Sequence, residues 1–339
     1  MNAEELWTEF CKHSNIDITT PYEAWAFCGG GPDGDELADL VLARRKFGTA
    51  TAYAEYALEN NLEMIPKVGD YSVILKDNGN AVCVLKTYDM YIKPFNEVTP
   101  FHAYSEGEGD RTLETWRDIH KRAFSPLLIQ NNLTLDGNTK IICEKLSLEY
   151  APSLNLDPEN PLFLDPEELL FLEPSLTYEN EIKAYRHEML EANSSFDGCF
   201  SLKRHESIAE YVEECTKWSN PISETNDSNT HVNIIMAVRK SDNKVIGFFQ
   251  VMSNPTEDMK KYTGFIGYSV RPSERKKGYA KKLLHKAIDF ARCLGHDEIL
   301  VTCLPDNEAS RRTIITNGGR FKQTVYYEKD DIHLDQYLL

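Results

Sequence analysis

Residues 267–280, which read GYSVRPSERKKGYA, decide how the second half of the chain folds. The stretch reads as a β-strand that runs to Val270, followed by a loop that contains Gly278. Beyond this loop, Gly295 stands at a C-cap position, and apolar residues recur at helical spacing at Leu283, Leu284, Ala287, Ile288 and Ala291. A helix that begins here presents unpaired main-chain N–H groups and a partial positive charge. The sequence therefore predicts a binding site for a diphosphate group at this loop.

The residues on either side continue an alternation of strands and helices. Residues 298–303 (EILVTC) predict a strand, and Asn307 opens a second helix that stops at residues 317–319 (NGG). Upstream, the patterns predict helices over 182–192 and 206–218, and strands over 169–172, 234–238, 245–252 and 264–270. The expected fold of this half is α/β, on a mixed and largely antiparallel sheet.

The motif Arg275-x-x-Gly278-x-Ala280, with a strand before it and the helices after it, resembles the acetyl-CoA signature of GNAT N-acetyltransferases. The resemblance implies a GNAT fold, acetyl-CoA as the cofactor and direct transfer of acetyl to an amine. It implies that main-chain amides around Val270 hold the pantetheine arm, and that those of residues 276–280 hold the diphosphate, assisted by the mobile charges of the loop. The implied cofactor-binding residues are Val270, Arg271, Arg275, Lys276, Lys277, Gly278, Tyr279, Ala280, Asn307 and Ser310.

The catalytic groups of this half depart from the family pattern. Many GNAT members place a tyrosine seven residues after the asparagine that opens the second helix, as proton donor to the leaving thiolate, and here that position holds Ile314. Tyr268, Ser310 or solvent then takes this role, although Tyr268 also suits the packing of a strand. No carboxylate lies within residues 264–270, so we expect the amine proton to leave through water. Residues 220–231 form a loop of the kind that selects the acceptor.

The first half carries a second resemblance, spread over residues 34–42, 46–51, 68–71, 94–98, 106–110, 116–117 and 120. These runs look like an ASCH domain, which implies a PUA-like β-barrel with helices and a nucleoside or RNA ligand. Some small members hydrolyse the acetyl amide of 4-acetylcytidine with a K-x-x-T motif and a later Glu, and the matching residues are Lys46, Thr49 and Glu106. Thr51 stands where those members have an Arg.

Two interpretations of these residues remain open. In the catalytic one, burial lowers the pKa of Lys46 so that it activates the Thr49 hydroxyl, and Glu106 carries the proton to the leaving amine. In the other, Lys46 is a cation at a helix C-terminus, while Glu106, Glu108 and Asp110 cap and solvate a Gly-rich loop. The surrounding patterns predict a helix over 36–45 and strands over 71–75 and 81–87, joined by the hairpin signal DNGN at 77–80.

Composition and charge divide the chain at its middle. We expect an ASCH domain over residues 1–150, a linker rich in proline and acids over 151–167, and a GNAT domain over 168–339. Residues 1–150 carry a net charge of −10, residues 151–180 carry −7, and the remainder is neutral. This distribution disfavours non-specific binding to nucleic acid.

The eight cysteines include no CxxC pair, and neither a leader nor a membrane span is apparent. We therefore expect a cytoplasmic protein without a metal site or disulfides, and no membrane partner.

Three functions are compatible with these patterns. The first is an acetyl-CoA-dependent N-acetyltransferase acting on a small-molecule or peptide amine, with an ASCH domain that binds or processes a nucleoside or RNA-like ligand. The second is a non-catalytic protein that binds acetyl-CoA and a nucleotide ligand, because the tyrosine is missing. The third is a 4-acetylcytidine amidohydrolase with an accessory second domain. Neither the acceptor nor the oligomeric state follows from the sequence.

Overall fold

The computed structural model describes residues 1–155, 168–222 and 230–339. The chain divides into two compact units, residues 1–166 and residues 167–339. Most of the expected linker, from residue 156 to residue 167, lies outside the described residues, as do residues 223–229 of the loop expected to select the acceptor.

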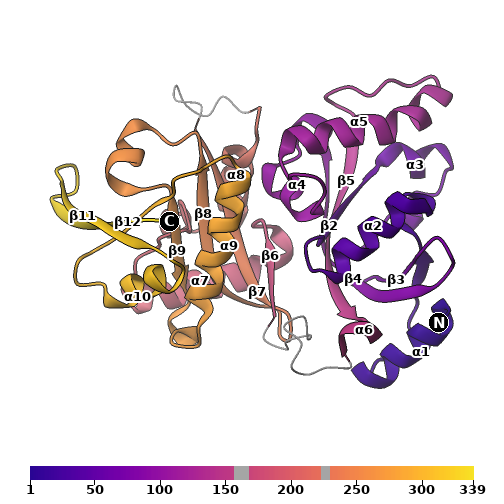
Figure 1. Ribbon diagram of the computed structural model, residues 1–339, viewed down its shortest axis with the longest axis horizontal. Helices are drawn as coiled ribbons and strands as arrows, with labels where there is room; N and C mark the ends of the chain where they lie inside the picture. Colours follow the sequence, from indigo (N-terminus) through magenta and orange to yellow (C-terminus); the bar gives the residue numbers. More distant parts are fainter. Residues whose placement is uncertain (156–167, 223–229) are drawn as a thin grey trace. The chain divides into compact units, whose positions relative to one another are not determined.

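Unit 1 is built on one five-stranded sheet in the order β1-β3-β4-β5-β2 (Figure 1). Its strands are β1 (Glu23–Trp25), β2 (Gly48–Ala52), β3 (Tyr71–Leu75), β4 (Ala81–Pro94) and β5 (Lys140–Tyr150). β1 pairs parallel with β3, and the other pairs are antiparallel. The predicted β3–β4 hairpin is confirmed, with Gly79 at φ 77° in its turn. The sheet is a half-barrel that ends at β1 and β2, which agrees with the predicted PUA-like fold of strands and helices.

Helices pack on both faces of this sheet. The helix predicted over 36–45 runs instead from Gly31 to Leu42, because Pro32 in its first turn has the φ of a helix start. On β5, Leu146 and Leu148 face α2, whereas Ile141 and Cys143 face α4 and α5, as the alternation of a pleated strand requires. The helices of this unit are α1 (Ala3–Ser14), α2 (Gly31–Leu42), α3 (Tyr53–Leu58), α4 (Pro100–Glu106), α5 (Leu113–Gln130) and α6 (Pro152–Asn155).

Unit 2 contains two antiparallel sheets. Four strands run in the order β6-β7-β8-β9, and three in the order β10-β12-β11. The first four are β6 (Leu169–Leu172), β7 (His231–Arg239), β8 (Lys244–Ser253) and β9 (Ile266–Val270). The other three are β10 (Leu300–Cys303), β11 (Arg320–Tyr327) and β12 (Ile332–Leu338).

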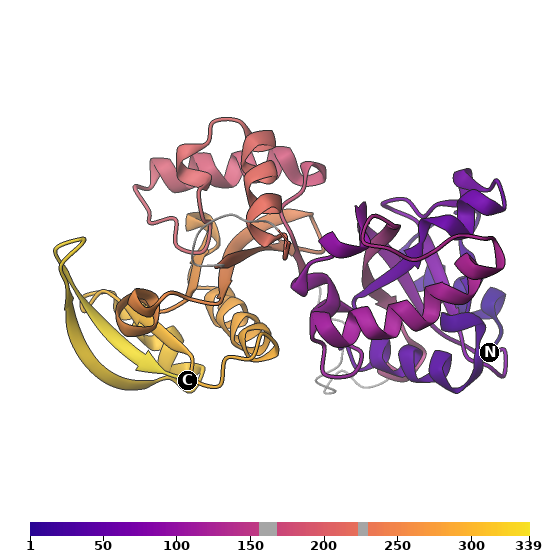
Figure 2. The ribbon, with the colours of Figure 1, turned by 90° about the horizontal axis from the view of Figure 1, so that it is seen from above.

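Helices α7 and α8 cover one face of the four-stranded sheet and α9 covers the other (Figure 2). Tyr185 of α7 packs on Phe248 of β8 with 4.9 Å between ring centroids. On the opposite pleat, Gly247 lies so close to Leu283 of α9 that a Cβ atom would come within 2.9 Å of it. The apolar stripe predicted for α9 is confirmed, since all five of its residues are buried. The helices are α7 (Glu179–Glu191), α8 (Ile208–Ser219), α9 (Tyr279–Cys293) and α10 (Glu308–Thr316).

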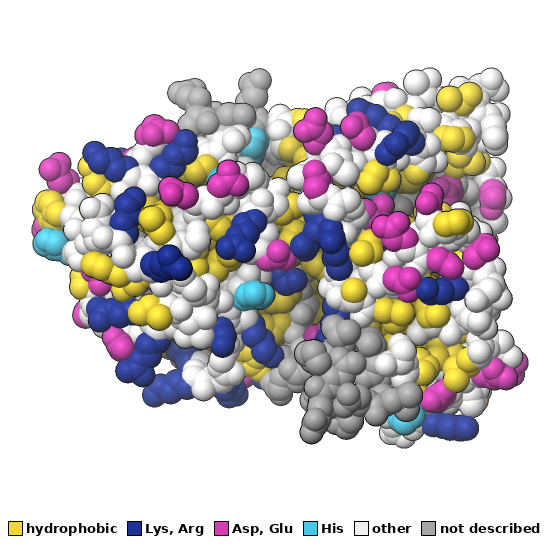
Figure 3. All heavy atoms as spheres, viewed as in Figure 1, with side chains coloured by type: hydrophobic (Ala, Val, Ile, Leu, Met, Phe, Trp, Pro, Cys, Tyr) yellow, Lys and Arg dark blue, Asp and Glu magenta, His cyan; other side chains and the backbone are white. Residues whose placement is uncertain are grey.

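The surface charge differs between the two units. On the face drawn in Figure 3, acidic side chains are frequent over unit 1, and Lys and Arg are frequent over unit 2. This agrees with the net charge of −10 for residues 1–150 and of zero for residues 181–339. Within the described part of the chain, no helix is long and apolar enough to cross a bilayer, and His, Cys, Asp and Glu form no cluster that could hold a metal.

Candidate active site

The outer edge of β9 is the first part of the site in unit 2. Just before β9 the chain passes close to β10, because a Cβ at Gly264 would collide with the carbonyl oxygen of Leu300. From Ile266 onward, the only strand that pairs with β9 among the described residues is β8. The two sheets therefore separate along β9.

The register of β9 shows which of its main-chain N–H and C=O groups bond to β8 and which point away from it. The Phe265 carbonyl accepts from Met252 N–H at 3.0 Å, and Arg271 N–H donates to the Ile246 carbonyl at 2.8 Å. In an antiparallel pair every second residue bonds to the partner strand. Tyr268 and Val270 therefore direct their N–H and C=O groups away from β8, on the side where the sheets separate.

The N-terminus of α9 is the second part. Gly278 is its N-cap residue at φ 86°, and Lys276 has φ 64°, so the loop turns through two left-handed residues. No intramolecular acceptor in the described structure meets the main-chain N–H groups of Lys276, Lys277, Gly278 and Ala280. A Cβ at Gly278 would meet nothing within 4 Å, so the space around it is open. The predicted anion site thus has unpaired donors and access from solvent.

The three basic side chains of the loop differ in their contacts. Arg275 donates from Nε to the Val270 carbonyl at 3.0 Å and from Nη2 to Ser194 Oγ at 2.9 Å. Lys277 lies 2.8 Å from Glu274, whereas Lys276 is exposed. We expected Arg275, Lys276 and Lys277 to act as mobile charges, and this is wrong for Arg275, which is held against the end of β9.

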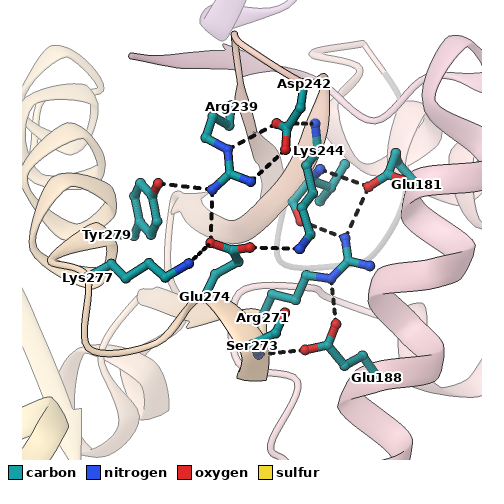
Figure 4. Close-up of polar contacts among 11 residues, drawn as sticks. Glu181, Glu188, Arg239, Asp242, Lys244, Arg271, Ser273, Glu274, Lys277 and Tyr279 are labelled. Carbon is teal, nitrogen blue, oxygen red and sulfur yellow. Dashed lines mark hydrogen bonds and ion pairs between the residues drawn. The ribbon is translucent and has the colours of Figure 1, made fainter. Parts of the chain in front are cut away.

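A network of ion pairs joins this loop and the end of β9 to β7, β8 and α7 (Figure 4). Glu274 is almost fully buried and accepts from Arg239 at 2.9 Å, Lys244 at 2.7 Å and Lys277 at 2.8 Å. Burial alone would raise the pKa of Glu274, but the hydrogen bonds from these three cations outweigh it and lower the pKa to about 2. Glu274 is thus ionised and links β7, β8 and the loop.

Arg271 belongs to the same network. Its Nε donates to Glu188 at 2.7 Å and its Nη1 to Glu181 at 3.0 Å, both on α7. Its main-chain N–H donates to Ile246 of β8, and its Nη1 also donates to the Val245 carbonyl of β8 at 3.2 Å, so both groups already have partners within the unit. The placement favours a structural role for Arg271, and its predicted contact with the cofactor stays a prediction. Tyr279 likewise directs its hydroxyl to Arg239, at 3.3 Å.

The side chains of Tyr268 and Ser310, the two residues considered as proton donors, are in hydrogen-bond contact. The Tyr268 hydroxyl lies 2.9 Å from Ser310 Oγ, and Ser310 N–H donates to the Asn307 side chain at 3.1 Å. Burial raises the pKa of Tyr268 to about 12, so that the phenol keeps its proton at neutral pH. Ile314, at the position of the family's tyrosine, is fully buried and packs on Gly319.

In unit 1, Lys46 and Glu106 form a buried ion pair. Lys46 Nζ lies 3.1 Å from Glu106 and 2.9 Å from Glu108, and Glu106 also accepts from Trp116 Nε1 at 2.5 Å. His102 Nε2 lies 3.1 Å from the same carboxylate. Glu106 is buried, so the interpretation in which it solvates a loop is wrong for this residue. Lys46, expected in the same interpretation to be a cation at a helix C-terminus, pairs instead with the two carboxylates.

The expected pKa of Lys46 is also corrected. Burial alone would lower it, but the charges of Glu106 and Glu108 outweigh burial, and the pKa is raised. Lys46 is therefore a cation and cannot act as the base that takes a proton from Thr49.

Thr49 lies next to a carboxyl group that the sequence motif does not contain. Thr49 of β2 stands opposite Glu144 of β5 in the register, whereas Lys46 contacts Glu106. Thr87 Oγ1 donates to Glu144 at 3.0 Å. Glu144 could have been noticed only as a charged residue that interrupts an apolar strand pattern, which gives no indication of a partner.

The geometry of unit 2 thus comprises a helix N-terminus with unpaired N–H groups beside the open edge of β9. Two family models match the chain: one described as the ASCH domain over residues 23–150, and one described as the acetyltransferase (GNAT) family over residues 192–314. The chain therefore has an ASCH domain followed by a GNAT domain, and the predicted enzyme class, an N-acetyltransferase, is confirmed.

Solved structures resemble each unit separately. The ASCH domain of Lactobacillus crispatus JV V101 is 23% identical over 43% of this chain and 94% of its own, with a TM-score of 0.40. The Microcin C7 self-immunity acetyltransferase MccE, solved with acetyl-CoA and AMP, is 17% identical over 51% and 92%, with a TM-score of 0.37. A GNAT acetyltransferase of Bacillus anthracis is 16% identical over 52% and 95%, with a TM-score of 0.35. No curated protein matches the chain at a significant level.

Proposed function

We propose that unit 2 transfers an acetyl group from acetyl-CoA directly to the nitrogen of a small-molecule or peptide amine. The observation that carries this proposal is the set of unpaired N–H groups that opens α9, at Lys276, Lys277, Gly278 and Ala280 in the described chain. Donors at a helix N-terminus bind a diphosphate without a particular side chain. The match to the GNAT family supports acetyl-CoA as the molecule that carries it.

The outer edge of β9 supports a site for the pantetheine arm. Val270 N–H and both main-chain groups of Tyr268 face the side where the sheets separate, and the arm has amides that can pair with such groups. Asn307 and Ser310, at the start of α10, are linked to Tyr268 by hydrogen bonds and line the other side of the arm in this proposal.

Tyr268 supplies the proton in the proposed chemistry. The amine nitrogen forms a bond to the acetyl carbon, the bond from that carbon to sulfur breaks, and the phenol proton moves to the departing thiolate. Ser310 orients the phenol through its hydroxyl, and Tyr268 is reprotonated from solvent. The proton that the amine loses passes to water, since the described residues 264–270 include no carboxylate.

Thiol release from acetyl-CoA with a panel of amines tests the transfer. The variant Ala280→Pro removes one N–H donor in the first turn of α9, where proline is tolerated, and Ala280→Ser is the matched control that keeps it. We expect the proline variant to need about 10 to 100 times more acetyl-CoA for half-maximal turnover, because a hydrogen bond to a charged group is lost. Equal dependence on acetyl-CoA in both variants would refute the assigned site.

A second function is supported by unit 1, for which we propose a nucleoside or RNA-like ligand. The buried Lys46–Glu106 pair contacts His102 and Trp116, so several polar groups gather inside unit 1. Because Lys46 is charged, the cluster suits ligand binding better than base catalysis. Incubation with 4-acetylcytidine separates the alternatives, since release of acetate that Lys46→Ala abolishes would establish a hydrolase.

A further inference from the structure

The last strand of the three-stranded sheet in unit 2, β11, has an open edge. Among the strands that the structure describes, β11 pairs only with β12, so it lies at the end of this sheet (Figure 1). The pairing is regular from Gln323 to Tyr327, beyond a β-bulge at the start of the strand. Every second residue of β11 directs its main-chain N–H and C=O groups away from β12. A strand edge with such unpaired groups can pair with a strand of another chain.

The side chains of β11 are exposed on both faces of the sheet. Residues 320–324 are all exposed, although successive side chains of a strand point to opposite faces. Phe321 is 58% exposed and Tyr326 is 47% exposed, and their rings contact β12 from the side that faces α10. Exposed aromatic side chains beside an open strand edge are typical of a protein–protein interface.

The charges of β11 and of the turn after it are separated by sign. Arg320 and Lys322 lie in the first part of the strand, whereas Glu328 and Asp330 lie in the turn after its end. All four side chains are exposed, and none of them has an ion-pair partner among the residues that the structure describes. The segment therefore carries a positive end and a negative end that are not neutralised within the chain.

This order of charges makes the segment complementary to a second copy of itself in the antiparallel direction. If Val325 of one copy lies opposite Val325 of the other, Lys322 of each copy comes next to Glu328 of the other. Arg320 comes next to Asp330 in the same alignment, and a two-fold axis forms each contact twice. A parallel alignment would place like charges together, which is unfavourable. The charges thus permit one orientation and oppose the other.

We propose that β11 is the surface through which two copies of this chain associate, by antiparallel pairing of the two strands across a two-fold axis near Val325. Main-chain hydrogen bonds then join the two three-stranded sheets into one continuous sheet. Phe321 and Tyr326 extend the contact on one face of it. The ion pairs at the two ends are exposed, so they set the direction of pairing more than they add affinity.

Sedimentation equilibrium of the full chain between about 1 and 100 μM tests this inference. We expect the mass of the native protein to rise with concentration from 38.8 kDa toward twice that value. The variant Arg320→Glu with Lys322→Glu places acidic groups together at both ends, so its dimer dissociation constant should be at least about tenfold higher. Adding Glu328→Lys and Asp330→Lys to it restores opposite charges in reversed order and should restore the dimer.

The matched control is Lys183→Glu with Lys217→Glu, which makes the same change in charge at exposed positions of α7 and α8. It should dimerise as the native protein does. Circular dichroism confirms that each variant is folded.

Three results would overturn the inference. A mass of 38.8 kDa for the native protein at every concentration would show that the chain does not self-associate. A dimer that the change at Arg320 and Lys322 does not weaken would place the contact on another surface. Failure of the four-residue variant to dimerise again would rule out the antiparallel alignment. None of these measurements depends on acetyl transfer, so their outcome is separate from the proposed function.

Discussion

At the scale of single residues, the proposed mechanism depends on Tyr268 as the proton donor. Tyr268→Phe removes the hydroxyl that lies 2.9 Å from Ser310 and leaves the ring in place. We expect kcat to fall by about 100-fold or more, the usual contribution of a positioned acid, with no change in the affinity for CoA. Steady-state kinetics together with CoA titration measures both. Ser310→Ala should lower kcat by a smaller factor. An unchanged kcat for Tyr268→Phe would contradict the role proposed for Tyr268.

Lys46 is the residue on which the polar interior of unit 1 depends. Lys46→Met keeps the volume but leaves Glu106 buried without its cation, so we expect a loss of about 3–5 kcal/mol in the free energy of unfolding. The double variant Lys46→Met with Glu106→Gln should recover part of that loss, because no bare charge remains. Urea unfolding gives the free energy of unfolding of the native protein and both variants. A loss well below about 3 kcal/mol for Lys46→Met alone would show that Glu106 does not depend on Lys46 for its charge partner.

At the scale of elements, Glu274 anchors the loop before α9. Glu274→Gln should lower the free energy of unfolding by about 1–3 kcal/mol at neutral pH, less than for a fully buried pair because Lys277 can turn to water. The pKa is lowered from 4.5 to about 2 in the folded chain, so the stabilisation is complete above pH 5 and is lost between pH 4.5 and 2. The difference between native and variant proteins should therefore vanish near pH 2. If the difference in the free energy of unfolding stayed constant across this pH range, Glu274 would not be held ionised by these cations.

The same scale shows what the sequence could and could not predict. The strand, loop and helix around Gly278 follow from periodicity and turn chemistry, which act within a few residues, and the structure has all three of them there. The Glu274 network and the pairing of Thr49 with Glu144 join residues from separate elements, and their register is set only when the sheets form. The raised pKa of Lys46 could not be predicted for the same reason, since the charges that outweigh its burial come first from Glu106 and then from Glu108, both distant in the sequence.

At the scale of the whole molecule, the chain forms two compact units, and we have proposed a separate ligand for each. Destabilising one unit should therefore leave the ligand affinity of the other unchanged. We expect Lys46→Met to bind CoA as the native protein does at temperatures where unit 1 is weakened. Calorimetry with CoA checks this, and a matching loss of CoA affinity would show that the two units depend on each other.

The central claim is that the N-terminus of α9 binds the diphosphate of coenzyme A. Isothermal titration of the full chain with CoA, repeated with Ala280→Pro and Ala280→Ser, tests it most directly. The account predicts saturable binding by the native protein and Ala280→Ser, and a dissociation constant about 10 to 100 times higher for Ala280→Pro. Absence of binding by the native protein, or equal affinity in all three, would contradict it.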